Sequence, residues 1–394
     1  MAISVYEISS GLSQIPREHS TAFLSAVEAA LGDSLAQISL NHFLDEPFGI
    51  IYVSSGGSEG LFLQQFSSYD KPCYLLTSGD SNSLAASMEI LAYLRQTGRK
   101  GEIMHGDVEL IAGRIRTLSR AARAKKQLTG IRIGVVGKPS DWLIASELDR
   151  VACKKKLGVE VVDIPMGELL EAYQATPAIE NEWTTRLRAL GYDAKEMDKA
   201  LAIYSALKSI VAIHNLGAIT VRCFDLLGSV CTTGCLALAI LNAEGIYAGC
   251  EGDVPSTLSM AILGELSGQP VFMCNPSRID TRAGHMVLAH CTLPVNMPSE
   301  MTLTTHFESG IGVAIAGTIP LGTCTVFKTG ADLARHFAKA GKIEKNLREA
   351  ALCRTQIQVA LDDMTYFLTD PIQNHHLVCT GDYTAEIAEF FALL

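Results

Sequence analysis

The sequence lacks the features of several classes of protein. It has no long run of basic residues and carries a formal net charge of -10, so it offers no broad positive surface to a nucleic-acid backbone. Its most apolar stretches, such as residues 235–250, are broken by polar residues before about 18 positions, the length that a membrane-spanning helix needs. The chain does not open with a basic segment and an apolar core, so we expect no signal peptide and a cytoplasmic location.

The cysteines lack the spacing of a metal or disulfide framework. There are 11, an odd number, scattered from Cys73 to Cys379 and mostly within apolar segments. The one local pair, Cys231 and Cys235, has no second pair to complete the four ligands of a structural zinc site. This pattern indicates buried, reduced thiols in a reducing compartment.

What is present is enough apolar material for more than one core. The chain has 394 residues, of which 48% are hydrophobic and 19% charged, and it exceeds the roughly 250 to 300 residues that one core usually serves. We predict an α/β protein with two Rossmann-like domains, residues 1–130 and 131–280, followed by a mostly antiparallel, barrel-like β domain with a terminal helix, residues 281–394.

This prediction follows from the order of the hydrophobic patterns. In the first third of the chain, short apolar runs alternate with amphipathic helical patterns, which is typical of βαβ units. A fresh strand-like run begins at residue 131, and the same rhythm resumes after a charged helical stretch, residues 168–216. From residue 285 onward, short apolar runs follow one another with few helices between them, which favours an antiparallel sheet or barrel.

Glu251 stands where an apolar strand ends and a helix is about to begin. In open α/β sheets, functional groups gather at the carboxyl ends of the strands. Asp253 precedes Val254 and Pro255, the pattern of a helix cap followed by a proline in the first turn, so a structural role explains it. Glu251 has no such explanation, and a buried charge needs a partner. We therefore interpret it as functional, with a solvent-facing glutamate as the alternative.

Two histidine segments near the end of the chain are candidate metal ligands. His290 interrupts an apolar strand, where a hydrogen-bonded core histidine is the alternative reading. His375 and His376 are adjacent, so in an extended segment they point to opposite faces and one of them can face a site. Together with Glu251, these imidazoles would suit a divalent ion such as manganese.

Two glycine-rich turns follow strands, at residues 54–60 and 135–141. Neither matches the dinucleotide fingerprint or the phosphate-binding loop, so we interpret both as strand-to-helix connections. A minor role in holding a substrate oxygen stays open for Ser58, Glu59 and Lys138.

The segment VRCFDLLGSVCTTGCLALAILNAEGIYAGCEGDVPSTLSMAILGELSGQPVFMCNPSRIDTRAGHMVLAHCTLP, with the later THFESGIGVAIAG and NHH, resembles the L-fucose/L-arabinose isomerase superfamily, in particular its short fucose-isomerase-like members. The resemblance is specific over residues 217–382 and only architectural before them. It implies two Rossmann-like domains and a β-rich domain, assembly as a homo-oligomer, commonly a trimer or hexamer, and interconversion of aldoses and ketoses. It also implies a divalent metal, usually manganese, with magnesium or cobalt as alternatives.

The same resemblance assigns roles to residues. Glu251 falls on the family's first metal-ligand glutamate, which also helps to move the proton, and His290 on a histidine ligand. The NHH motif falls on the C-terminal histidine ligand, which leaves the choice between His375 and His376 open. The family's second acidic ligand falls at Cys274 and Asn275, which carry no carboxylate. Either Asn275 ligates through its amide oxygen, or Asp280 or Glu308 takes over, or the acid–base pair is altered.

The expected chemistry is transfer of a carbonyl between C1 and C2 of a sugar through an enediol. A metal ion would stabilise the charge on its oxygens, and a carboxylate would carry the proton. Arg222 could orient a hydroxyl or an anionic substituent, with an ion pair to Asp225 as the equal alternative. The predicted residues are Glu251, Asp280 and Arg222 for catalysis, Glu251, His290, His375, His376 and Asn275 for the metal, and Ser58, Glu59, His306 and Glu308 for the substrate.

The leading hypothesis is therefore a cytoplasmic, metal-dependent aldose–ketose isomerase that binds a small sugar and neither nucleic acid nor membrane. The missing second carboxylate and the paired α/β lobes motivate one alternative, a sugar-binding protein without catalysis. Arg222 and Asn275 motivate another, an isomerase of a modified, acidic sugar.

Overall fold

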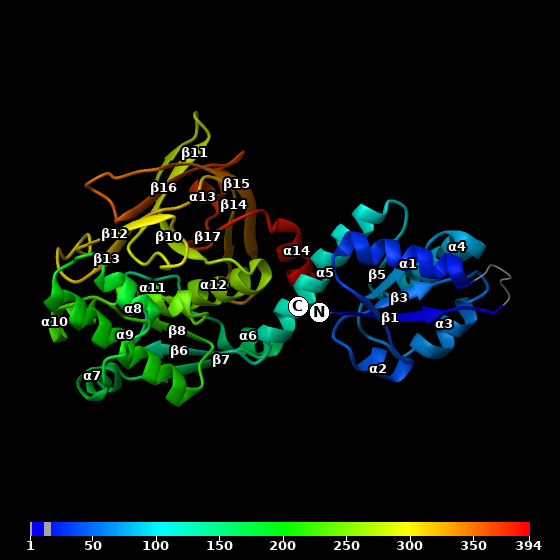
Figure 1. The fold of residues 1–394 in the computed structure, drawn as a ribbon, viewed down its shortest axis with the longest axis horizontal. Helices are drawn as coiled ribbons and strands as arrows, with labels where there is room; N and C mark the ends of the chain where they lie inside the picture. The colour runs from blue at the N-terminus through cyan, green and yellow to red at the C-terminus, as the bar shows by residue number, and fades with distance from the viewer. Residues whose placement is uncertain (1, 12–16) are drawn as a thin grey trace. The chain divides into compact units, whose positions relative to one another are not determined.

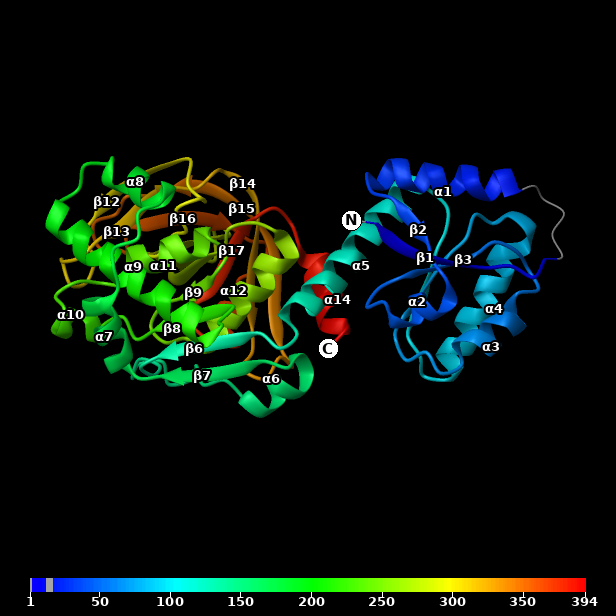
Figure 2. The ribbon, with the colours of Figure 1, turned by 60° about the horizontal axis from the view of Figure 1, so that its bottom comes forward.

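The computed structural model describes residues 2–11 and 17–394, and the chain forms two compact units, Met1–Lys126 and Gln127–Leu394. Unit 1 runs from blue to cyan in Figures 1 and 2, and unit 2 from cyan-green to red. In the described part of the chain, no helix combines the length and the apolar character needed to cross a bilayer.

Unit 1 is a parallel sheet with the strand order β2-β1-β3-β4-β5. Its strands are β1 (Ile3–Ile8), β2 (Leu35–Gln37), β3 (Ile50–Val53), β4 (Cys73–Leu76) and β5 (Gly101–Met104). Its helices are α1 (Arg17–Leu31), α2 (Leu40–Asp45), α3 (Glu59–Phe66), the 3-10 helix η1 (Asp80–Asn82), α4 (Ser83–Gln96) and α5 (Val108–Leu128), which leads into unit 2.

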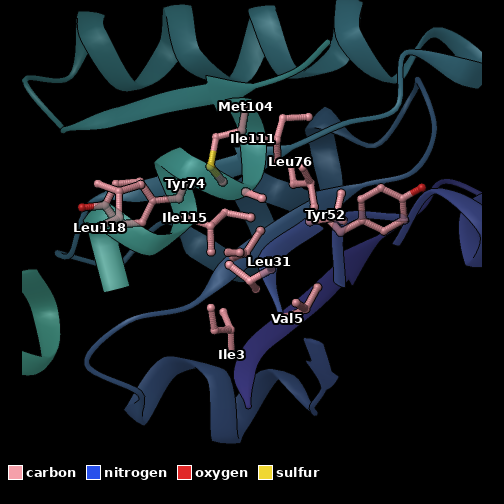
Figure 3. Packing of buried hydrophobic residues seen from close by; sticks show 13 residues of the cluster. Ile3, Val5, Leu31, Tyr52, Tyr74, Leu76, Met104, Ile111, Ile115 and Leu118 are labelled. Carbon is pink, nitrogen blue, oxygen red and sulfur yellow. The ribbon is translucent and has the colours of Figure 1, made fainter. Parts of the chain in front are cut away.

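Helices cover both faces of this sheet, and its strands β3 and β4 are apolar throughout. All four residues of β3 are buried. Ile50 and Tyr52 point into the core that Figure 3 shows, where Ile111 and Ile115 of α5 pack against the sheet. The alternate residues, Ile51 and Val53, enter the core on the other face. This continuous apolar run is what a parallel strand buried on two sides requires.

Unit 2 combines a second parallel sheet with a closed barrel. The sheet has the order β7-β6-β8-β9. Its strands are β6 (Arg132–Val136), β7 (Glu160–Ile164), β8 (Ala218–Val221) and β9 (Tyr247–Gly249). The accompanying helices are α6 (Arg150–Leu157), α7 (Met166–Ala175), α8 (Glu182–Arg188), α9 (Ala194–His214), α10 (Asp225–Ser229), α11 (Cys235–Ala243) and α12 (Val254–Ser267).

The barrel is antiparallel and closes in the order β10-β11-β16-β15-β14-β17. Its strands are β10 (Phe272–Asp280), β11 (His285–His290), β14 (Gly322–Thr329), β15 (His336–Asn346), β16 (Thr355–Ala360) and β17 (His376–Thr380). A separate hairpin pairs β12 (Glu300–Thr304) with β13 (Ala314–Thr318), and the helices are α13 (Thr365–Thr369) and α14 (Thr384–Ala392).

This arrangement confirms the predicted fold class, parallel α/β sheets followed by an antiparallel barrel. The first barrel strand begins at Phe272, before the predicted start of the β domain at residue 281, because the apolar run after α12 already pairs with β17. The sheet and the barrel belong to one compact unit, so their division into separate domains stays a prediction.

Helix α12 joins the two halves of unit 2. It packs against β8 and β9 of the sheet and against β14 and β17 of the barrel (Figures 1 and 2). Nearly every one of its side chains is buried. A helix enclosed on all sides has no need of a polar face, which explains why residues 254–267 carry one charged residue, Glu265. The N-terminus of α12 brings the end of β9 close to the barrel.

Candidate metal site

Glu251 lies in a tight turn between β9 and α12. Its φ of 62° places it in the left-handed region, and Gly252 follows with a φ of 72°. The turn is held from two sides, because Ser140 N donates to Glu251 O at 2.9 Å and Gly252 N donates to Val221 O at 3.0 Å. A Cβ on residue 252 would come within 2.5 Å of Lys138 O, so only glycine fits this approach. The neighbouring strand ends thus set the position of Glu251.

Glu251, His290 and His375 converge although they are far apart in the sequence. One ligand atom from each lies within 4.8 Å of the other two. His375 Nε2 is 3.5 Å from Glu251 Oε1, and His290 Nε2 is 4.0 Å from the same oxygen. His290 ends β11 and His375 immediately precedes β17, so the barrel supplies both rings and the parallel sheet supplies the carboxylate.

The three residues fit a divalent metal ion. His375 is fully buried, and its Nε2 atom has no hydrogen-bond partner among the described residues. An unpartnered buried nitrogen is costly unless a ligand satisfies it. Two imidazoles and one carboxylate form a donor set that suits manganese, iron, cobalt or zinc. The remaining coordination positions would be open to water or substrate.

Buried hydrogen bonds orient both rings. His290 Nδ1 lies 2.8 Å from Thr292 Oγ1. His375 Nδ1 lies 2.9 Å from Asp253 Oδ2, a carboxylate with no solvent exposure. Asp253 also accepts a hydrogen bond from Ser256 N at 2.8 Å and so caps α12 as predicted. Asp253 therefore has two functions, because it also supports a predicted ligand.

The protonation of the cluster follows from burial and from mutual charge. Burial raises the pKa of Glu251, but the nearby positive charge of His375, 3.5 Å away, outweighs it and helps to bring that pKa to about 2. Burial lowers the pKa of His375, but Asp253 and Glu251 raise it to about 9. Burial lowers the pKa of His290 to about 3, so this ring is neutral and keeps a free lone pair. Glu251 and His290 are thus in the states that bind metal.

His376 points away from the cluster. Its Nδ1 lies 3.0 Å from Asn374 O, and because a carbonyl only accepts, Nδ1 carries the proton. Its Nε2 then accepts from Tyr366 Oη at 3.0 Å. The aromatic rings of Phe337 and Phe367 surround it, and burial lowers its pKa to about 3. Both nitrogens are engaged, so the structure selects His375 from the pair and does not support His376 as a ligand.

The structure does not place Asp280 near the three ligands. The register pairs Asp280 with His285 and Asn275 with Ala289, so Asp280 lies at the opposite end of the β10–β11 hairpin from His290. Five strand residues span roughly 17 Å. There Asp280 accepts hydrogen bonds from the backbone of a turn. Its predicted catalytic role is not supported.

Asn275 is closer to the ligands, but its amide is engaged. Its side-chain oxygen accepts from Asn374 Nδ2 at 3.3 Å, beside the segment that carries His375. The predicted ligation through its oxygen therefore stays a prediction.

Arg222 forms the ion pairs that the alternative reading expected. It contacts Asp225 at 3.0 Å and Asp141 at 2.7 Å and donates to Pro139 O at 2.7 Å. Two carboxylates thus compensate its charge. Arg222 therefore links the loops that follow β6 and β8. These contacts do not support its predicted catalytic role.

His306 and Glu308 lie in the loop between β12 and β13, within electrostatic range of the cluster. Burial lowers the pKa of His306, and the charge of Arg354 adds to that effect while Glu251 opposes it. Partial desolvation raises the pKa of Glu308, although the residue is exposed, and the negative charge of Glu251 raises it further. These two predicted substrate residues are therefore electrostatically coupled to Glu251.

The glycine-rich turns hold the remaining candidates. Ser58 and Glu59 belong to unit 1, where Ser58 Oγ donates to Ser55 O at 2.8 Å next to the start of α3. Lys138 pairs with Asp141 at 3.2 Å. Contact of these residues with a substrate stays a prediction.

Sequence reasoning missed Trp142. Its indole Nε1 donates to Glu251 Oε2 at 2.6 Å, yet 52% of the residue is exposed. The ring centres of Trp142 and Phe224 are 4.9 Å apart, and those of Phe224 and His306 are 5.6 Å apart. A row of three aromatic rings therefore lies beside the carboxylate. Neither spacing nor pattern marks this loop residue. By contrast, Lys328, a lysine within the apolar strand β14, is visible in the sequence as a charge inside an apolar run.

Comparison with known proteins identifies sugar isomerases as relatives, although no family model matches the chain. The sulfoquinovose isomerase of Alkalicoccus urumqiensis is 22% identical over 372 residues, which cover 87% of this chain and 84% of that protein. The sulfoquinovose isomerase of Priestia aryabhattai is 23% identical over 318 residues, 73% of this chain and 71% of that protein. The sulfoquinovose isomerase of Clostridium sp. (strain MSTE9) is 27% identical over 235 residues, which cover 56% of this chain and 52% of that protein. These relatives confirm the prediction of an enzyme of the sugar isomerase class.

Proposed function

We propose that the protein is a metal-dependent aldose–ketose isomerase whose substrate is a sugar with an anionic substituent. The convergence of Glu251, His290 and His375 carries the metal-dependent part of this proposal. The relatives carry the substrate class, because the sugar in their name, sulfoquinovose, bears a sulfonate. Manganese is the metal that we favour, in keeping with the family resemblance.

The reaction removes a proton from the carbon beside the carbonyl and returns it to the neighbouring carbon. Glu251, His290 and His375 would hold a divalent ion, which would supply Lewis-acid stabilisation of the negative charge that develops on the sugar. The low pKa of Glu251 keeps its carboxylate ionised, which suits a ligand better than a proton carrier. Trp142 holds the second carboxylate oxygen.

Glu308 is our candidate for the proton carrier. An acid–base group works best when its pKa lies near the working pH, and the pKa of Glu308 is raised by partial desolvation and by the charge of Glu251. It is also the carboxylate that can replace the acid missing at Asn275. His306, two residues earlier in the same loop, would contact the sugar.

Arg354 is a better candidate than Arg222 for binding the anionic substituent. It donates to Thr305 O at 2.8 Å and to Thr305 Oγ1 at 3.1 Å, next to His306. Its guanidinium lies 5.6 Å from the centre of the Phe307 ring. Within residues 2–11 and 17–394, no carboxylate forms an ion pair with it, whereas Arg222 has two. Its charge therefore remains available for a sulfonate or carboxylate.

The test is a substrate panel with manganese and a Glu251→Gln variant. We expect ketose formation from aldoses that carry a sulfonate or a carboxylate, at higher kcat/KM than from their neutral counterparts. Glu251→Gln should lower kcat by at least about 100-fold, since even residues behind the ligands cost 10- to 100-fold. The exposed Glu300→Gln in β12 is the matched control and should keep full activity.

Undiminished turnover by Glu251→Gln would overturn the metal-site assignment. A preference for neutral aldoses would overturn the substrate class alone. Sugar recovered unchanged from a protein that binds it would favour the second candidate, a sugar-binding protein without catalysis, which the amide at Asn275 motivates.

A further inference from the structure

Lys328 is a charged residue in the interior of unit 2. It lies on β14 and is fully buried, and its Nζ donates to Ser256 Oγ in the first turn of α12. Removing an ammonium group from water costs several kcal/mol unless nearby groups compensate it. A buried lysine of this kind needs a reason beyond packing, because an apolar side chain would fill the same space without that cost.

The contacts of Lys328 lead to His375. Ser256 Oγ accepts from Lys328 Nζ and donates to Asp253 Oδ2 at 2.6 Å. The same carboxylate oxygen lies 2.9 Å from His375 Nδ1. Asp253, Ser256, Lys328 and His375 all have no solvent exposure. A continuous buried path therefore runs from the barrel strand, through the start of α12, to the ring at the start of β17.

This path determines which nitrogen of His375 faces the metal site. An ionised carboxylate only accepts hydrogen bonds, so His375 Nδ1 carries a proton. The other nitrogen, Nε2, then points toward Glu251 and has no hydrogen-bond partner in the described structure. A carboxylate behind a histidine ligand fixes its ring orientation and tautomer in metal sites generally.

Capping of α12 does not explain the lysine. Asp149 caps α6 and Asp193 caps α9 in the same way, because each carboxylate accepts from backbone N–H groups. Both of these aspartates are exposed, and within the described chain neither has a buried cation behind it. At Asp253, the carboxylate is buried and shared with a histidine. The additional cation fits that second function.

We propose that Lys328 is a positioning residue for the metal site: through Ser256 and Asp253 it holds the His375 ring with Nε2 directed at the divalent ion. The inference rests on the proposed function only in placing a divalent ion at Glu251, His290 and His375. It adds a residue from the barrel strand that does not itself contact the ion.

The test compares Lys328→Met and Ser256→Ala with a matched control, Ser259→Ala. Ser259 lies one turn further along α12, where its Oγ accepts from Thr329 N at 3.1 Å and donates to Pro255 O at 2.7 Å. The control thus removes a buried contact between the same helix and strand without touching Asp253. Cobalt affinity is measured by absorption titration of the full-length protein. The His375 tautomer is measured by nitrogen NMR of the metal-free protein at about pH 10, where the ring is neutral because its pKa is about 9.

We expect Lys328→Met and Ser256→Ala to weaken cobalt binding by about 10- to 100-fold and to mix the tautomers of His375. Ser259→Ala should bind cobalt within about twofold of wild type, even where it melts at a lower temperature. Should Lys328→Met fail to fold, Ser256→Ala, which keeps the lysine but breaks the path, decides the question.

Equal cobalt affinity and an unchanged tautomer in Ser256→Ala and the folded Lys328→Met would overturn the inference while the proposed function stands. An equal loss in the Ser259→Ala control would also overturn it, because the effect would then be general loosening of α12. Absence of cobalt binding by the wild-type protein would overturn both the inference and the proposed metal site.

Discussion

The conformation of Glu251 is unusual for its residue type. A residue other than glycine in the left-handed region costs about 1 to 3 kcal/mol, and such residues persist where the surroundings hold them. Here Ser140, Val221 and Trp142 contact the turn or its carboxylate. The strain is therefore offset by the loops that also form the site. A carboxylate held in this way meets the two histidines without having to reorganise.

The cysteines give a prediction at the residue scale. Of the 11, all within the described residues, Cys231 is the exposed one. Burial is the main cause that raises the pKa of Cys73 to about 11 and those of Cys153, Cys324 and Cys379 to about 12. Since the thiolate is the reactive form, these four stay protonated and unreactive at pH 8 and at pH 9.

Labelling of the native protein with a thiol reagent should therefore modify Cys231 rapidly at pH 8, while Cys73, Cys153, Cys324 and Cys379 stay unmodified at pH 8 and at pH 9. Mass spectrometry of the labelled peptides identifies the modified sites, and Cys231→Ser is the control that removes the expected fast site. Rapid labelling of any of the four buried thiols would contradict the expected burial.

At the scale of elements, the close packing of β9 against α12 brings the turn of Glu251 to the barrel. Gly249 ends β9, and a Cβ at this position would collide with the side chain of Thr257 on α12. Thr257 is buried, and its Oγ1 donates to Asp253 O at 2.7 Å. The absence of a side chain at residue 249 therefore allows the strand and helix to approach each other.

We expect Gly249→Ala to destabilise the protein by about 1 to 3 kcal/mol, the usual cost of overpacking a core. The double variant Gly249→Ala with Thr257→Ala should recover part of that loss, because it removes the colliding group. Urea unfolding of the two single variants and the double variant measures the coupling. Additive losses would show that the two residues do not conflict.

At the scale of the whole molecule, the three candidate ligands lie in unit 2, and unit 1 contributes none of them. A ligand that binds only the folded form stabilises it by about 2.7 kcal/mol when its concentration is 100 times its Kd. Both tryptophans of the chain, Trp142 and Trp183, also belong to unit 2. Tryptophan fluorescence therefore reports the unfolding of this unit alone.

Excess manganese should raise the melting temperature detected by tryptophan fluorescence, and Glu251→Gln should abolish the increase. Glu300→Gln is the control, because it leaves the site intact and should respond to manganese as the wild-type protein does. An equal increase in Glu251→Gln would locate manganese binding elsewhere.

The sequence by itself determined the class of fold and indicated the first candidate ligand. Alternating apolar runs and amphipathic helices predict parallel sheets, and a shift to short runs predicts the barrel, because these patterns depend on local periodicity. Glu251 was found in the same way, as a charge at the end of an apolar strand with no capping role. His290 and the His375–His376 pair were found as polar interruptions of apolar strands, with the family resemblance in support.

The tertiary structure alone decided which side chains meet. It selected His375 over His376, because the partners of each ring come from other elements, and it separated Asp280 from the cluster through the register of β10 and β11. Trp142 reaches Glu251 across 109 positions, and Lys328 reaches Ser256 across 72. Contacts between residues so distant leave no local periodicity in the sequence, since they arise only when the sheet, α12 and the barrel pack together.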